Sequence, residues 1–141
     1  MEIITFKAVH AWDFPPQNGF TRAGMLAMAK RLEASGPGFT AMDNGTPIGA
    51  AGICLYWEGV GEAWTLFSLE LKRQPILLTR TVKRVLNDVI KAMDLHRVQI
   101  AVRADQEVNK CWARALGFSN PLPLPKYGPD GADYVMYSRL T

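Results

Sequence analysis

Two cationic side chains stand where one hydrophobic pattern ends and another begins. Lys72 and Arg73 follow an apolar and aromatic run over residues 62–71 and come just before Pro75. From Ile76 to Met93, apolar residues recur every three or four positions, which is typical of an amphipathic helix. Free backbone N–H groups at a helix start, next to cationic side chains, are suited to holding phosphates. An ordinary strand–turn–helix connection would give the same pattern, so both interpretations stay open.

The residues most often used in metal and redox sites stand apart from one another. Cys54 and Cys111 are distant in sequence and lie outside any paired-ligand spacing, so we expect two reduced thiols. His10 and His96 form no cluster with other ligand types. The sequence therefore predicts neither a metal ion nor a disulfide.

Composition and charge narrow the class of protein. At 141 residues with 48% hydrophobic side chains, the chain suits a single domain spanning residues 1–141. No apolar run reaches membrane-spanning length and the first residues do not resemble a secretory signal, so we expect a cytoplasmic protein without membrane contact. A net charge of +3 suits a phosphorylated ligand, and without a recognisable reading motif we expect no nucleic-acid partner.

Periodicity and turn residues predict a mixed α/β (α+β) domain. A helix between the strands at 62–71 and 96–102 makes these two a parallel pair, and the Asn44-Gly45 dipeptide predicts an antiparallel hairpin. Four prolines from Pro121 to Pro129 predict a long loop. The expected strands are 3–9, 39–42, 48–56, 62–71, 96–102 and 134–140, and the expected helices are 17–33, 76–93 and 106–115.

The segment from Asn109 to Phe118, a short helix ending in Leu116-Gly117-Phe118, resembles the late helix of the GCN5-related N-acetyltransferase (GNAT) superfamily. The order of predicted elements over nearly the whole chain is similar as well. The resemblance implies a mostly antiparallel sheet flanked by helices, with the central parallel strand pair splayed apart. It further implies that acetyl-CoA lodges in that gap and that an acetyl or other acyl group passes to a primary amine.

The resemblance also assigns residues to the cofactor. Pantetheine carries amides and would pair like an added strand with free backbone, and the diphosphate would rest on the turn and helix start. The implied cofactor-binding residues are Ser68, Leu69, Glu70, Leu71, Lys72, Arg73, Gln74, Arg80 and Asn109. The family's turn carries glycines where this chain has Ile76 and Leu78, so bulky side chains stand at the expected phosphate loop.

Three side chains are candidates for proton transfer. Glu62 and Glu70 on the central strand are candidate bases for freeing the amine, directly or through water, and each is equally compatible with a solvent-facing strand position. Members of the family often have a tyrosine that acts as the acid about four residues before the Gly-Phe pair. This chain has Ala113 at that position. Tyr127 in the predicted loop is the remaining candidate acid, with loop packing as its alternative role.

Two other functions remain open from sequence. The late helix is also similar to that of GNAT-like proteins of tailed bacteriophages. In that case the chain would be a non-catalytic structural protein of the virion, and Trp112 and Phe118 would be core residues. An acyl-CoA-binding module without turnover is the other alternative. The amine acceptor is not identifiable from these residues, and a homo-oligomer is compatible with them.

Overall fold

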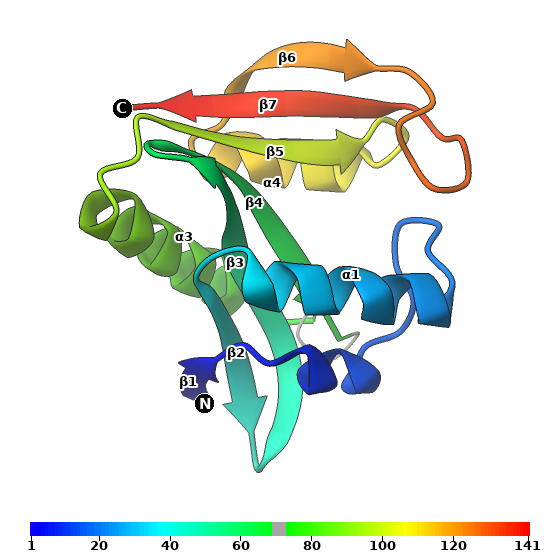
Figure 1. The fold of residues 1–141 in the computed structure, drawn as a ribbon, viewed down its shortest axis with the longest axis vertical. Coiled ribbons are helices and arrows are strands. Elements are labelled where there is room, and N and C mark those ends of the chain that lie inside the picture. The colour runs from blue at the N-terminus through cyan, green and yellow to red at the C-terminus, as the bar shows by residue number, and fades with distance from the viewer. Residues whose placement is uncertain (69–72) are drawn as a thin grey trace.

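A seven-stranded sheet forms the centre of the molecule (Figure 1), with strand order β1-β2-β3-β4-β5-β7-β6. The computed structural model describes residues 1–68 and 73–141. All neighbouring strands are antiparallel except β4 and β5. The strands are β1 Glu2–Thr5, β2 Gly38–Asp43, β3 Thr46–Trp57, β4 Val60–Phe67, β5 Arg97–Arg103, β6 Ser119–Leu124 and β7 Tyr134–Leu140. The helices are the 3-10 helix η1 Ala8–Asp13 and the α-helices α1 Arg22–Ala34, α3 Pro75–Ala92 and α4 Glu107–Ala115.

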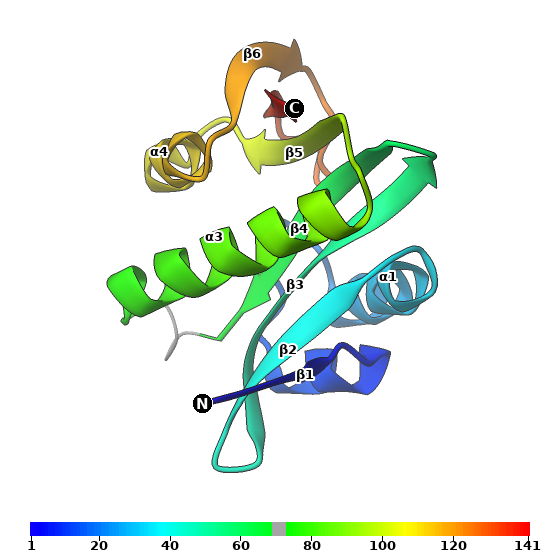
Figure 2. The same cartoon turned by 90° about the vertical axis from the view of Figure 1, so that its left-hand side faces the viewer.

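Helices cover both faces of the sheet, and each face has its own hydrophobic core. Figure 2 shows α3 and α1 on opposite sides of β3 and β4. The core beneath α3 and α4 includes Leu86, Val98 and Phe118, whereas the core beneath η1 and α1 includes Phe14 and Met25. The predicted mixed α/β arrangement, mostly antiparallel with flanking helices, is confirmed.

The N-terminal elements differ from the sequence prediction. The first strand ends at Thr5 rather than at residue 9, and a 3-10 helix follows it. The first α-helix begins at Arg22 instead of residue 17 or 18, because Asn18 and Gly19 both have positive φ angles and form a turn. The Thr21 side chain then caps the helix by accepting a hydrogen bond of 3.0 Å from the Gly24 N–H.

The proline-rich segment also differs, because part of it is a strand. The prediction of a long loop from Pro121 was wrong: β6 pairs with β7 at the edge of the sheet and contains Pro121 and Pro123. The pairing is irregular between Ser119 and Leu122. An edge strand tolerates proline because one side of its backbone has no neighbouring strand to bind. The loop proper begins after Leu124.

The central parallel pair is splayed, as the sequence resemblance implied. Strands β4 and β5 pair over three positions only, from Val60 opposite Arg97 to Glu62 opposite Gln99. Beyond these positions the two strands diverge (Figure 1). None of the described strands therefore lies beside β4 on this side from residue 63 to Phe67.

Candidate active site

Two cavities meet in the gap between β4 and β5. The first, of about 330 Å³, lies toward α4, and the second, of about 370 Å³, lies toward α1 and the loop before β7. We call them the α4 cavity and the α1 cavity. The α4 cavity is bordered by residues including Phe67, Arg103, Gln106, Asn109, Trp112 and Ala113. The α1 cavity is bordered by residues including Phe20, Met25, Met28, Glu62, Trp64 and Tyr127. Both share Gln17, Asn18, Thr65, Ile100 and Ala101, so they form one cleft.

The backbone of β4 offers hydrogen-bonding groups to this cleft. The Ser68 N–H donates to the Ile48 carbonyl of β3 at 3.0 Å. Because hydrogen-bonding direction alternates along a strand, Thr65 and Phe67 direct their N–H and C=O groups toward the gap instead. The Ser68 N–H itself points away from the cleft. The predicted cofactor residues Leu69, Glu70, Leu71 and Lys72 lie outside the described residues.

An amide side chain already occupies part of this free backbone. The Nε2 group of Gln17 donates to the Phe67 carbonyl at 2.8 Å, and the Phe67 N–H donates to Gln17 Oε1 at 3.4 Å. Gln17 thus pairs with β4 as the amide of a neighbouring strand would. The sequence placed this residue at a helix start and held no signal for the contact, which joins positions 50 residues apart.

Replacing this amide tests the contact. Gln17→Met keeps the length of the side chain and removes both hydrogen bonds, so we expect the free energy of unfolding to fall by about 1–2 kcal/mol in urea titrations. The matched control is Gln74→Met, since Gln74 is exposed and makes no capping hydrogen bond with its side chain. Equal stability of Gln17→Met and the unmodified protein would contradict the proposed role of this contact.

The Glu62 carboxylate and the Tyr127 phenol line the α1 cavity, and a second phenol, Tyr56, forms a hydrogen bond with Glu62. Glu62 Oε1 accepts a hydrogen bond of 3.3 Å from Gln99 Nε2. Burial first, and then the negative charge of Glu62 and its hydrogen bond with the phenol, raise the pKa of Tyr56 to about 12. Burial first, and then the charge of Glu62, also raises the pKa of Tyr127. Both phenols therefore stay protonated at neutral pH, and both lie close enough to Glu62 for its charge to raise their pKa values.

The ionisation of Tyr56 reports on this cluster. Monitored by ultraviolet absorbance at alkaline pH, one of the four tyrosines is expected to ionise at about pH 12, and Tyr56→Phe removes this step. Glu62→Gln removes the charge that adds to the shift and is expected to lower the pKa of Tyr56, while burial, the largest single cause, still raises it. The raised pKa favours the neutral phenol, so its contribution to stability is present below about pH 10 and is lost as the pH rises through 12. If the titration of Tyr56 were the same in Glu62→Gln, the Glu62 carboxylate would not contribute to the pKa of Tyr56.

Trp112 connects α4 to the first turns of α3. Its Nε1 group donates to Thr79 Oγ1 at 2.9 Å, and the Thr79 hydroxyl donates to the Pro75 carbonyl at 2.7 Å. The indole also packs edge-on against Phe67, with ring centroids 5.6 Å apart. The sequence interpretation placed Trp112 and Phe118 in the core. Phe118 is buried there, whereas Trp112 is half-buried and forms part of the cavity wall.

The predicted phosphate-binding side chains do not border the cleft. Arg73, Gln74 and Arg80 are exposed and line neither cavity, whereas Asn109 lines the α4 cavity. The two bulky residues expected to crowd the site do not border either cavity, because Ile76 is 69% exposed to solvent and Leu78 packs against the buried pair Ile48 and Phe67. The first N–H groups of α3 remain unpaired within the helix, so its N-terminus still offers donors.

One arginine at the α4 cavity was missed by sequence reasoning. Arg103 Nη1 lies 2.8 Å from Asp130 Oδ2, and its Nε lies 3.1 Å from Asp105 Oδ1. These contacts fix the guanidinium at the cavity wall and partly compensate its charge. The guanidinium in turn holds the pKa of Asp130 below its usual value. Asp130 is distant in sequence, and nothing in the pattern indicated the pair.

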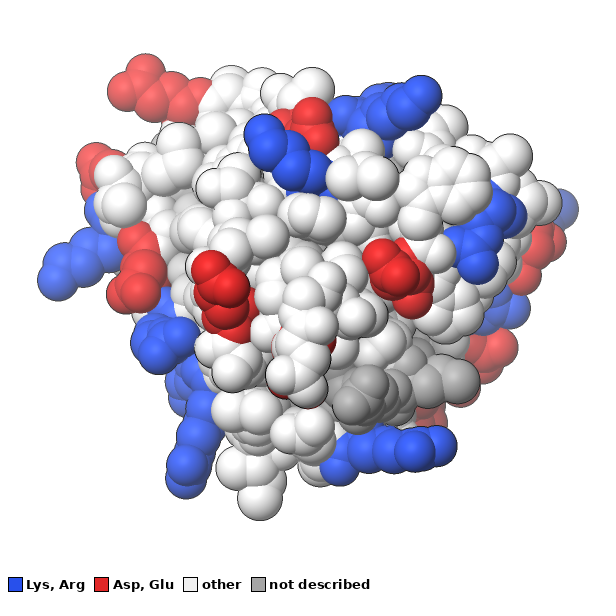
Figure 3. All heavy atoms as spheres, turned by 90° about the horizontal axis from the view of Figure 1, so that it is seen from below, with Lys and Arg blue, Asp and Glu red and all other residues white. Residues whose placement is uncertain are grey.

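Charge is distributed over the surface without large single-sign areas on the face shown in Figure 3, where Lys and Arg mix with Asp and Glu. Among the residues that the structure describes, no group of three or more His, Cys, Asp or Glu side chains is placed to hold a metal ion. No described helix has the length and hydrophobicity needed to cross a membrane.

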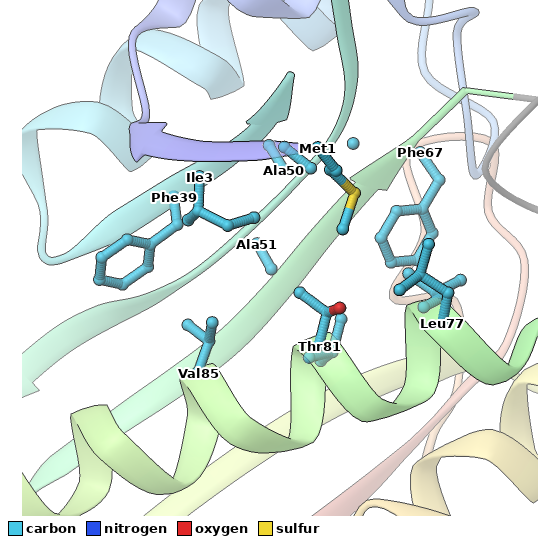
Figure 4. Close-up of a pocket in the computed structure, with 13 residues that line it drawn as sticks. Met1, Ile3, Phe39, Ala50, Ala51, Phe67, Leu77, Thr81 and Val85 are labelled. Carbon is cyan, nitrogen blue, oxygen red and sulfur yellow. The ribbon is translucent and has the colours of Figure 1, made fainter. Parts of the chain in front are cut away.

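A further cavity, of about 40 Å³, lies between the β1–β3 region and α3. Figure 4 shows Met1, Ile3 and Phe39 facing Leu77 and Val85 across it. Its described lining contains no titratable side chain, and a space of this size holds only one or a few water-sized molecules. The described lining of this cavity offers no group for proton transfer.

Solved structures of acetyltransferases share this architecture. A chimera of spermidine N-acetyltransferase SpeG from Vibrio cholerae and hSSAT is 12% identical, with a TM-score of 0.78 over 99% of this chain and 94% of that chain. A GNAT-family acetyltransferase from Bacillus anthracis is 16% identical, with a TM-score of 0.71 over 98% and 93%. The fold is that of the GNAT acetyltransferases. The ribosomal L7/L12 α-N-protein acetyltransferase RimL, in complex with coenzyme A, is 12% identical, with a TM-score of 0.67 over 86% and 73%.

Sequence comparisons give no further assignment. No family model matches the chain, and no curated protein matches it. The GNAT fold of this chain is thus recognised through its three-dimensional arrangement, including the splayed pair β4 and β5.

Proposed function

We propose that this protein transfers an acetyl group from acetyl-CoA to a primary amine. The observation that carries the proposal is the cleft where β4 and β5 part, because it is continuous and opens toward both faces of the sheet. A thioester entering from one face and an amine entering from the other would meet between the strands. Neighbours with this fold include acetyltransferases, one of them in complex with coenzyme A.

The α4 cavity suits the cofactor arm. Pantetheine amides can pair with backbone groups left free by a missing strand, and Thr65 and Phe67 offer such groups. A pantetheine amide that pairs with Phe67 has to displace the side chain of Gln17. The N-terminus of α3, held to α4 by Trp112, offers N–H donors for the diphosphate. Arg73 and Arg80 remain proposed contacts for the nucleotide outside the cleft.

The α1 cavity suits the amine and its proton transfer. The acceptor arrives as an ammonium ion and loses a proton to Glu62, directly or through a water molecule. The neutral amine then attacks the thioester carbonyl carbon, a C–N bond forms, and the C–S bond breaks. The leaving thiolate takes its proton from Tyr127, whose raised pKa keeps the phenol protonated at working pH. The second proton that leaves the nitrogen as the amide forms returns to the Tyr127 oxygen, and the proton held by Glu62 passes to solvent. These roles agree with the position of both residues at one cavity.

Two measurements test the proposal. Acetyl-CoA at 100 times its Kd is expected to stabilise the fold by about 2.7 kcal/mol and raise the Tm by several degrees. Release of free thiol that requires both acetyl-CoA and an amine is expected in a continuous assay. A Tm that stays constant at millimolar acetyl-CoA would contradict the proposal.

The same measurements separate the alternative functions. An acyl-CoA-binding module would show the Tm shift without amine-dependent thiol release. A structural virion protein would show neither, and would instead associate with itself or with particle proteins. We propose the transferase because a non-catalytic scaffold does not require a proton acceptor and a protonated phenol at the mouth of the cleft.

A further inference from the structure

We propose that the acceptor is a small monoamine whose ammonium group is attached to an apolar or aromatic body. This inference rests on the proposed function and narrows its substrate class. It follows from three properties of the α1 cavity: one carboxylate, walls made of apolar and aromatic side chains, and a loop fastened at one side.

The first property is the charge of the cavity. Glu62 is the one carboxylate, and no Lys or Arg appears, among the described residues that line it. The nearby carboxylate of Asp130 is already engaged by Arg103 at 2.8 Å. A single ammonium group therefore finds one counter-charge. A second ammonium group on the same molecule would be desolvated without a partner, which is strongly unfavourable.

The second property is the nature of the walls. Phe20 and Met28 come from the α1 side, and Trp64 comes from β4. Tyr127 and Tyr134 pack edge-on with ring centroids 5.3 Å apart. Aromatic faces attract a cation, and apolar walls favour an apolar body by removing its surface from water. Both preferences suit an amine in which the charged group and a hydrocarbon or ring are close together.

The third property is closure. The Tyr134 hydroxyl donates to the Asn18 carbonyl at 3.3 Å, which joins the start of β7 to the turn before α1. Asp130 lies so close to the same turn that a Cβ on Gly19 would be 2.6 Å from its Cγ. The loop before β7 is thus fastened to the turn before α1 at one side of the cavity. A volume of about 370 Å³ accommodates a small amine, whereas a polypeptide would have to extend out of the cavity past this loop.

The test compares acceptors at constant acetyl-CoA. We would measure kcat/KM with phenethylamine, hexylamine, 1,5-diaminopentane, spermidine and a tripeptide with a free apolar N-terminus. Phenethylamine and hexylamine are expected to exceed the diamine, spermidine and the peptide by at least about tenfold, which corresponds to about 1.4 kcal/mol.

A designed variant tests the role of charge directly. Met28→Glu adds a second carboxylate to the cavity wall and is expected to raise the kcat/KM ratio of diaminopentane to hexylamine by about tenfold or more. Ala27→Glu is the matched control, because Ala27 is the neighbouring residue of α1 and is exposed. It adds the same charge outside the cavity and is expected to leave the ratio unchanged.

The outcomes distinguish this inference from the function beneath it. If diaminopentane, spermidine or the peptide matches or exceeds phenethylamine, the acceptor class is wrong and the transferase activity stands. If Ala27→Glu shifts the ratio as much as Met28→Glu, general surface charge rather than the cavity sets the preference, which also overturns the inference. If no amine releases thiol, the proposed function fails and the acceptor class fails with it.

Discussion

Glu62→Gln is expected to lower kcat/KM by about 10²–10⁴-fold, the range that a positioned general base contributes. The change keeps the size of the side chain and an oxygen that can accept the hydrogen bond from Gln99. It removes the group that would take the proton from the ammonium ion. Because the neutral amine is then scarce below its own pKa, the residual activity of the variant should rise with pH more steeply than that of the unmodified protein.

The control separates catalysis from binding. Glu58→Gln removes an exposed carboxylate from the turn between β3 and β4 and should leave kcat/KM unchanged. The Kd of acetyl-CoA, measured by calorimetry, should be equal in both variants, since neither side chain borders the α4 cavity. A Glu62→Gln protein with full activity would exclude Glu62 as the base.

Gly52→Ala is expected to lower the free energy of unfolding by several kcal/mol, in the range found when a well-packed core is overfilled. Gly52 lies in β3 opposite Trp64 of β4. A Cβ there would be 2.5 Å from the Pro37 carbonyl oxygen, 2.6 Å from Trp64 Cζ2 and 2.8 Å from the Gly38 Cα. Two of these three atoms belong to the backbone, so relief requires β2 or its approach to move.

Gly45→Ala provides the comparison for this prediction. A Cβ at Gly45 would meet nothing within 4 Å, but the residue has a φ angle of +78° in the β2–β3 turn. Its cost is therefore conformational alone and should be about 1–2 kcal/mol. Denaturant titration of both variants should show the larger loss for Gly52→Ala. A smaller loss than for Gly45→Ala would mean that the strands beneath Trp64 adjust easily.

Local patterns predicted most of the fold. The Asn44-Gly45 turn, the helix after Pro75 and the last strand over 134–140 all depend on neighbouring residues, and the structure has each of them. The errors occurred where longer-range contacts decide. Strand β6 exists because β7 lies beside it, and no local property of Pro121 and Pro123 indicates that partner.

The candidate site was less accessible from sequence for the same reason. The sequence singled out Glu62 and Tyr127, and the structure brings both to one cavity. The contacts of Gln17 with Phe67 and of Arg103 with Asp130 join positions that are distant in the chain. Such pairs depend on how the elements assemble, which periodicity and turn residues do not encode.

The short pairing between β4 and β5 divides the sheet into two parts. One has the four strands β1 to β4, and the other has the three strands β5, β7 and β6. Because β4 and β5 pair at only three positions, contacts between side chains hold the two parts of the sheet together. Helix α3 packs on both parts, since Leu86 and Val89 share a core with Ile53 of the four-stranded part and Val98 of the three-stranded part. A substitution that weakens the packing of α3 would let the two parts of the sheet move relative to each other. The width of the cleft between β4 and β5 therefore depends on core side chains that do not line it.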